Sequence, residues 1–165
     1  MNPVATVQRR ELDARCAGAV FTADDDGWDA ARQAWNLAVD QRPAAVALPV
    51  DGDDVASIVG YARENGLRVA AQGTGHNADA LGSLENTLLV RTSGLRGVEV
   101  YPERRVARVC AGDLWQDAVG PLAEHGLAAL AGSSPDVGIV GYSLGGGLGW
   151  LARKHGIQTN SDLTP

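Results

Sequence analysis

The sequence predicts an α+β fold in which a βαβ unit is followed by a mixed or antiparallel sheet with flanking helices. Between residues 44 and 71, two short apolar runs enclose a segment with helical periodicity. Between residues 86 and 112, extended runs follow one another with only turn residues between them. The 165 residues are enough for a domain with a sizeable core.

The first element that we expect is an amphipathic helix within residues 24–43. Its apolar positions recur near helical spacing, acidic residues precede it and a proline follows it. Residues 1–40 are accordingly interpreted as an N-terminal extension with a helix, and residues 41–165 as the main domain.

The βαβ unit comprises a buried strand in 44–50, a helix in 51–66 and a second strand in 67–71. A crossover of this length is typical of parallel strands. The later runs 86–92, 97–103 and 104–112 predict shorter strands, more antiparallel in character, with a hairpin turn at 102–104.

The remaining chain is expected to be partly helical. Residues 113–126 have helical spacing, with Asp113 placed to cap the start and Gly126 to end the helix. The glycine-rich segment 127–158 predicts loops and tight turns, followed by a short helix near 148–156.

Composition limits the possible partners. The net charge is -6 and there is no basic run, which argues against nucleic acid and anionic membranes. No stretch approaches 18 consecutive apolar residues. Cys16 and Cys110 lack metal-ligand spacing, and charges follow the pair Arg9–Arg10 where an export signal would be apolar. We expect a cytoplasmic protein with a small-molecule substrate and no metal.

Among the three histidines, His76 has the least ordinary setting. His125 and His155 each precede a glycine at a predicted helix end, where a histidine interacts favourably with the helix dipole. His76 instead lies between Gly75 and Asn77 in a turn after a predicted strand.

Two glycine-rich loops suggest a bound dinucleotide. Successive backbone N–H groups in such loops can hold a pyrophosphate without cationic side chains. Neither loop has the complete Rossmann or Walker A pattern. Tight turns and close strand contacts remain an alternative explanation for these glycines.

The quoted motifs resemble a known family. The Gly-x-Gly-His turn at 73–76, Pro-x-Val-Gly at 135–138 and Gly-Gly-Gly-x-Gly-Trp at 145–150 occur in an order similar to that of the vanillyl-alcohol oxidase superfamily. The resemblance is to its PCMH-type FAD-binding domain, particularly the berberine-bridge-enzyme-like branch, and it covers about residues 40–160.

The resemblance implies that His76 bonds covalently to the 8α-methyl carbon of FAD. It also implies that Ser134 stands where many relatives have a second, cysteinyl flavin link, so a single link is expected. Val137 matches the position beside the oxygen-reactive flavin carbon. The remaining implied FAD-binding residues are Gly73, Thr74, Gly75, Asn77, Ser133, Gly138, Gly141, Gly145 and Gly146.

The function implied is a flavin-dependent oxidase that passes hydride from a substrate C–H to flavin N5, with O₂ as acceptor. A non-catalytic or truncated nucleotide-binding module and an NAD-dependent Rossmann enzyme are the alternatives. The substrate domain and the end of the FAD-binding domain are expected beyond residue 165, so this stretch alone is expected to be inactive. No catalytic base is assigned, since Asp79 and Asp136 could equally cap turns.

Overall fold

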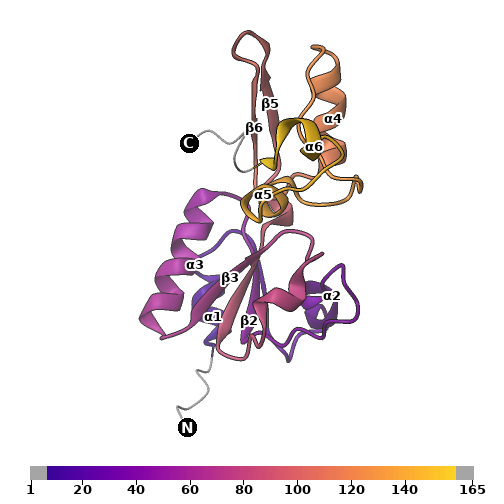
Figure 1. The fold of residues 1–165 in the computed structure, drawn as a ribbon. Helices are drawn as coiled ribbons and strands as arrows, with labels where there is room; N and C mark the ends of the chain where they lie inside the picture. Colours follow the sequence, from indigo (N-terminus) through magenta and orange to yellow (C-terminus); the bar gives the residue numbers. More distant parts are fainter. Residues whose placement is uncertain (1–6, 159–165) are drawn as a thin grey trace. The chain divides into compact units, whose positions relative to one another are not determined.

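The computed structural model describes residues 7–158, which divide into two compact units (Figure 1). The first unit runs through Gly94 and the second begins at Leu95. Each unit is described by itself.

A four-stranded mixed sheet forms the centre of the first unit. The strand order is β1-β2-β4-β3, with β2 and β3 each parallel to β4 and β1 antiparallel to β2. The parallel βαβ prediction is confirmed, and β4 lies between the two strands of that unit. The strands are β1 (Ala19–Phe21), β2 (Ala45–Leu48), β3 (Arg68–Gln72) and β4 (Thr87–Arg91).

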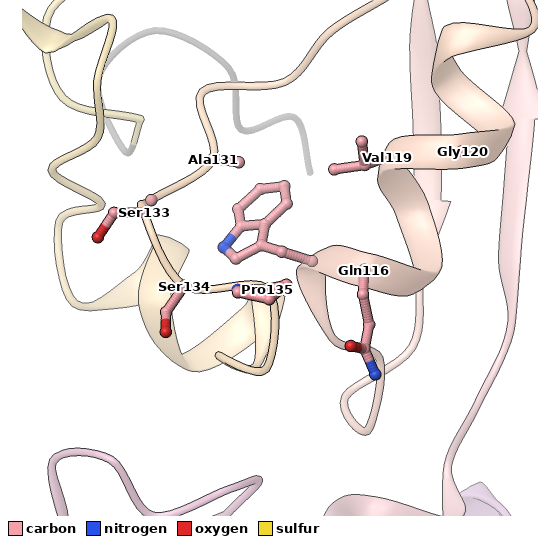
Figure 2. A pocket seen from close by; sticks show the side chains of 9 residues that line it. Gln116, Val119, Gly120, Ala131, Ser133, Ser134 and Pro135 are labelled. Carbon is pink, nitrogen blue, oxygen red and sulfur yellow. The ribbon is translucent and has the colours of Figure 1, made fainter.

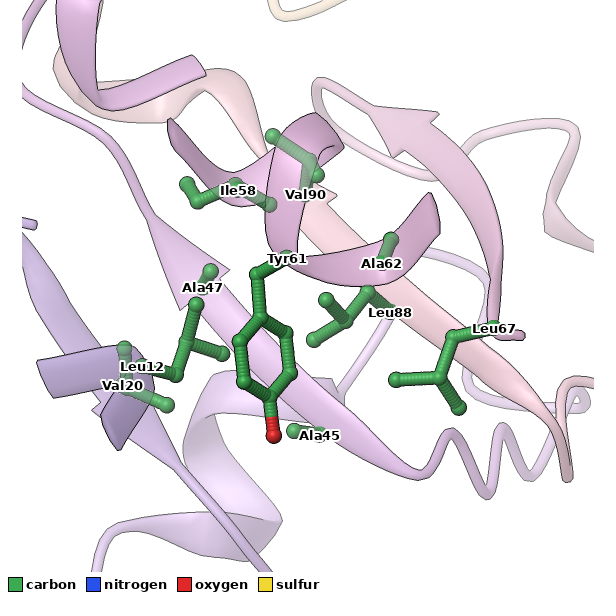
Figure 3. Close-up of a cluster of buried hydrophobic side chains, with 10 residues drawn as sticks. All are labelled: Leu12, Val20, Ala45, Ala47, Ile58, Tyr61, Ala62, Leu67, Leu88 and Val90. Carbon is green, nitrogen blue, oxygen red and sulfur yellow. The ribbon is translucent and has the colours of Figure 1, made fainter. Parts of the chain in front are cut away.

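Helices pack on both faces of this sheet because side chains of successive strand residues point to opposite faces. On one face, α1 (Arg9–Asp13) and α3 (Gly52–Glu64) pack over β2 and β4 around the fully buried Tyr61 (Figure 3). On the other face, α2 (Trp28–Arg32) and the 3₁₀ helix η1 (Ala78–Leu81) contribute to a second apolar cluster.

The predicted helix within 51–66 is confirmed, and the carboxylates of two aspartates fix its start. Asp51 accepts a hydrogen bond from the Asp54 amide at 2.9 Å, as an N-cap residue does. The buried Asp54 carboxylate then accepts the amides of Ala17, Gly18 and Val50 at 2.7, 2.9 and 3.0 Å. These hydrogen bonds tie α3 to the segments before β1 and after β2.

The helix expected within 24–43 is much shorter than its sequence pattern indicates. It ends at Arg32, and Gln33 is extended with a ψ of 125°. Arg91 donates to the carbonyls of Ala31 and Gln33 at 3.0 and 2.7 Å. Tertiary hydrogen bonds therefore replace the next helical turn, and the chain bends at Trp35 instead of continuing.

Up to residue 158, the second unit contains an antiparallel hairpin and three α-helices. β5 (Val98–Tyr101) and β6 (Val106–Val109) pair across η3 (Pro102–Arg104), which confirms the hairpin prediction. Side chains from both strands pack around a cluster centred on Trp115. The helices are α4 (Trp115–Ala123), α5 (Ile139–Leu144) and α6 (Ala152–His155).

Three expectations for the later chain need correction. Strand β4 belongs to the first sheet and pairs in parallel, so the antiparallel expectation holds only for β5 and β6. Asp113 does not cap α4, because its carboxylate accepts the Gly97 and Cys110 amides at 2.9 and 2.6 Å. The short helix α5 forms in the part of segment 127–158 that was expected to be loops and tight turns, whereas α6 lies within the short helix expected near 148–156.

Candidate functional site: the histidine turn and the second glycine-rich loop

His76 lies in the turn that links β3 to η1. Its side chain is half-buried, and the preceding Gly75 has a φ of +85°. A Cβ added at Gly75 would lie 2.8 Å from the Ala34 Cβ and 2.9 Å from the Gln72 Nε2. Both the backbone conformation and the close approach of residue 34 therefore require glycine at position 75.

The side chains of Trp35 and Thr74 contact the imidazole of His76. The indole of Trp35 stacks on it with ring centroids 3.9 Å apart and an interplanar angle of 15°. The Thr74 Oγ1 lies 2.8 Å from the His76 Nδ1, within hydrogen-bonding distance. The stack restricts the plane of the ring, and the hydrogen bond restricts which edge of the ring faces Thr74.

The backbone beneath the turn is held by a buried polar pair. The side-chain amides of Gln41 and Gln72 exchange two hydrogen bonds of 2.8 and 3.0 Å. The amide of Trp35 donates to the Thr74 carbonyl at 2.9 Å. The segment after α2 is thus joined both to the end of β3 and to the turn, and it places the indole against the imidazole.

Arg91, at the end of β4, also holds the segment after α2, because its guanidinium donates hydrogen bonds to the carbonyls of Ala31 and Gln33. Burial lowers the pKa of its guanidinium below the ordinary value. Its hydrogen bonds satisfy carbonyl groups that a longer helix would have paired internally.

The second loop, residues 133–138, is anchored by backbone hydrogen bonds to the start of α4. The amides of Trp115 and Gln116 donate to the carbonyls of Val137 and Pro135 at 3.1 and 2.9 Å. Val137 is half-buried and packs against the Trp115 cluster. The Ser134 hydroxyl donates to the Asp136 carboxylate at 3.0 Å.

Glycines in this loop, in α5 and just after α5 leave space that the described residues do not fill. A Cβ built at Gly138, Gly141 or Gly146 would meet no atom of the described residues within 4 Å. Packing therefore does not explain Gly138 and Gly141, whereas the φ of +114° at Gly146 favours glycine by itself. A Cβ at Gly145 would lie 3.0 Å from the Gly141 carbonyl oxygen. Open space at Gly138 and Gly141 suits the close approach of a ligand to the backbone.

A cavity of about 370 Å³ opens beside the second loop (Figure 2). Its lining includes Ser133, Ser134 and Pro135 from the loop and Gln116 from α4. Trp115 also lines it and is 2% exposed, and its Nε1 has no hydrogen-bond partner among residues 7–158. The cavity is thus apolar at the indole and polar at the serines.

The expected site residues form two groups, one in each unit. Gly73, Thr74, Gly75, His76 and Asn77 are consecutive in the turn after β3. The group from Ser133 to Gly146 lies in the loop, in α5 and in the two residues that follow α5, all in the second unit. His155 is the last residue of α6, and His125 follows the end of α4, as expected for helix ends.

Sequence reasoning missed Trp35 and Trp115 as site residues. The helical pattern within 24–43 predicts Trp35 on the apolar face of a helix, yet Trp35 is 56% exposed and stacks on the imidazole. Trp115 had no distinguishing sequence signal. The proximity of Trp35 to His76 follows only from the hydrogen bonds that end α2, which helical periodicity does not reveal.

Comparison with known proteins identifies the family. The profile of the FAD binding domain matches residues 43–161. The chain belongs to this family. The FAD binding domain assignment agrees with the resemblance seen in the sequence and with the mixed sheet and flanking helices of the structure.

Curated and solved relatives support the same assignment. The chain is 32% identical over 146 residues to (R)-6-hydroxynicotine oxidase of Paenarthrobacter nicotinovorans, covering 88% of this chain and 32% of the relative. It is 31% identical over 158 residues to glucooligosaccharide oxidase of Sarocladium strictum, covering 92% of this chain and 32% of the relative.

Among solved structures, BBE-like 1 of Physcomitrella patens superposes with a TM-score of 0.84 at 27% identity, covering 93% of this chain and 34% of that one. A glucooligosaccharide oxidase from Acremonium strictum, described with a 6-S-cysteinyl, 8α-N1-histidyl FAD, superposes at 0.78 with 29% identity, covering 90% and 32%. The chain spans about a third of the length of these relatives.

Within residues 7–158, no helix is both long and apolar enough to cross a membrane.

Proposed function

We propose that this chain is the FAD-binding part of an oxidase that carries FAD covalently on His76. The observation that carries the proposal is the presentation of the imidazole in a glycine turn, stacked on Trp35 and hydrogen-bonded by Thr74. Family membership supplies the cofactor, and the names of the relatives supply the class of reaction.

In this proposal each loop by itself holds part of a dinucleotide. The turn at 73–77 carries the polar side chains of Thr74 and Asn77. The open α-carbons of Gly138 and Gly141 leave room for close approach in the second loop. Backbone amides suit the pyrophosphate because they bind it without a cluster of cations. We assign Gly73, Thr74, Gly75, Asn77, Ser133, Gly145 and Gly146 to the same role.

FAD, when bound, supplies two-electron oxidation of a substrate C–H bond with O₂ as the final acceptor, which yields hydrogen peroxide. In this proposal His76 tethers the cofactor and withdraws electron density from it, which favours electron acceptance. Val137 keeps space for O₂, as its family position implies. The substrate pocket and the proton acceptor are assigned to other parts of the full protein.

Attachment through His76 is proposed to be the single covalent link. Ser134 stands where a cysteine would provide a second one, and a hydroxyl is a far weaker nucleophile than a thiolate. In the structure, that hydroxyl donates to the Asp136 carboxylate. The hydrogen bond holds the side chain within its own loop.

Covalent attachment is tested on the purified full protein by denaturing gel electrophoresis and ultraviolet illumination. We expect a fluorescent band from the native sequence, none from His76→Ala, and a fluorescent band from the matched control His125→Ala. A dark native band, or an equally bright His76→Ala band, would refute the assignment.

Oxidase activity needs a separate measurement. Peroxide release is followed with panels of alcohols, sugars and amines, with the flavin spectrum recorded before and after each substrate. Substrate-dependent bleaching and peroxide release support an oxidase. A protein that binds FAD but shows neither with any panel, nor with an artificial electron acceptor, would support a non-catalytic module instead.

A further inference from the structure

The stacked pair of Trp35 and His76 is unusual for its degree of exposure. Trp35 remains 56% exposed although its indole overlaps the imidazole at 3.9 Å. An indole that served only the core would be expected to bury more of its apolar surface. The contact with His76 accounts for the place of this side chain better than core packing does.

The backbone around Trp35 fixes this contact. Its amide donates to the Thr74 carbonyl at 2.9 Å, and the neighbouring Ala34 is 3% exposed beneath Gly75. The backbone that carries the indole is therefore fixed by the hydrogen bond to Thr74 and by the packing of Ala34 under Gly75. Its ring is held against the histidine even though much of it faces solvent.

Thr74 controls the remaining freedom of the imidazole. A stacked ring can still flip by 180° about its Cβ–Cγ bond, which keeps the ring plane but exchanges Nδ1 with Cδ2 and Nε2 with Cε1. The Thr74 Oγ1 lies 2.8 Å from Nδ1, so this exchange would break the hydrogen bond. A hydroxyl both donates and accepts, and it can serve either neutral tautomer.

We infer that Trp35 and Thr74 are positioning residues for His76, which together direct covalent attachment of the flavin to one ring nitrogen. The inference rests on the proposed attachment through His76. In that reaction, the imidazole nitrogen forms a bond to the 8α-carbon, while one N–H and one C–H bond break. The two protons and two electrons released pass through the flavin to O₂, which becomes hydrogen peroxide.

The consequence is a dependence of attachment on the orientation of one ring. Reactions that join two groups lose rate steeply when the groups are misaligned, and a displacement of about 1 Å can cost about a hundredfold. Removal of either contact leaves His76 in the turn. Loss of the Trp35 stack lets the ring plane tilt, and loss of the Thr74 hydrogen bond lets the ring flip about its Cβ–Cγ bond. Attachment should then be slow and divided between the two nitrogens.

The test uses the full protein produced without flavin and then mixed with FAD in air. Covalent flavin is measured over time as the amount that stays with acid-precipitated protein. After proteolysis, the histidyl-flavin products are separated by chromatography. Trp35→Leu and Thr74→Val are expected to slow attachment about tenfold or more and to give two histidyl-flavin isomers.

Conservative variants separate positioning from a structural role. Trp35→Phe keeps a ring for stacking and Thr74→Ser keeps the hydroxyl, so both should retain a single isomer and a rate near that of the native protein. Thr22→Val is the matched control, since it removes a hydroxyl that donates to Asp25 at 2.9 Å elsewhere in the same unit. Native rates and a single isomer in both Trp35→Leu and Thr74→Val would overturn the inference.

A second readout works without flavin. Nitrogen-15 NMR of the histidine side chains reports the hydrogen bonding of each ring nitrogen of His76, and His76→Ala identifies these signals by their loss. The Nδ1 signal is expected to shift in Thr74→Val, because the hydrogen bond at this nitrogen is lost. If the native protein takes up no covalent flavin, the proposed function fails. An unchanged Nδ1 signal in Thr74→Val would show separately that Thr74 does not orient the ring.

Discussion

Replacement of Gly75 by alanine should destabilise the first unit more than a left-handed backbone alone would. The φ of +85° costs an alanine about 1–2 kcal/mol relative to glycine. The added Cβ would also lie 2.8 Å from the Ala34 Cβ and 2.9 Å from the Gln72 Nε2, where forced repacking costs about 1–3 kcal/mol. We expect a total loss of about 2–5 kcal/mol.

Gly66→Ala is the matched control. Gly66 has a φ of +65°, and a Cβ built there meets no atom of the described residues within 4 Å. Its substitution should therefore cost only the backbone part, about 1–2 kcal/mol. The difference between the two variants isolates the contact between the turn and the segment at Ala34.

The measurement is equilibrium unfolding in urea, with the free energy of unfolding compared between the two variants and the native protein. Covalent flavin should fall in Gly75→Ala and stay at the native amount in Gly66→Ala. Equal losses of stability in the two variants would refute the reasoning, because they would show that residue 34 does not pack closely on the turn.

Three further predictions concern single side chains. Asp54→Ala should lower the free energy of unfolding by about 3 kcal/mol or more, because it removes a charged acceptor from three backbone amides, whereas Asp53→Ala should change it little. Hydrogen bonds from the amide of Val50, and then from those of Ala17 and Gly18, lower the pKa of Asp54. The contribution of Asp54 to the free energy of unfolding should therefore be complete above the unfolded pKa of about 3.9, and it should be lost as the pH falls through the folded pKa. Unfolding curves across that pH range test this. Arg91→Met should speed hydrogen exchange at the Trp35 amide by about tenfold, because the carbonyls that end α2 lose their donors, and unchanged exchange would contradict this. Mass spectrometry of tryptic flavopeptides should find FAD on the His76 peptide alone, and Ser134→Cys should add a second link if the loop already places residue 134 close enough; a native peptide pair bridged through Ser134 would contradict the single link.

The sequence alone predicts an element correctly where its local periodicity and its burial in the fold favour the same conformation. The apolar run at β2, the helical pattern of α3 and the extended pattern of β3 all form as expected. Hairpin chemistry at Pro102–Arg104 likewise predicted the β5–β6 turn. In these elements, short-range preferences and the final packing favour the same conformation.

Other elements depend on distant partners. The pattern after Trp28 favours a long helix, but hydrogen bonds from Arg91 and to the Thr74 carbonyl end it early. Asp113 stands at a typical capping position, yet the Gly97 and Cys110 amides take its carboxylate. For the candidate site, the motifs predicted His76 and both loops, whereas Trp35 was found only from the folded contacts.

The order of strands in the first sheet constrains when the histidine turn can form during synthesis. Within residues 7–158, β3 pairs only with β4, which follows it in the chain and separates it from β2. Before residues 87–91 leave the ribosome, the strand that leads into the turn has no neighbour to pair with. The sheet is therefore complete only when β4 lies between two strands that are made earlier, and the strand that leads to His76 gains its neighbour only then.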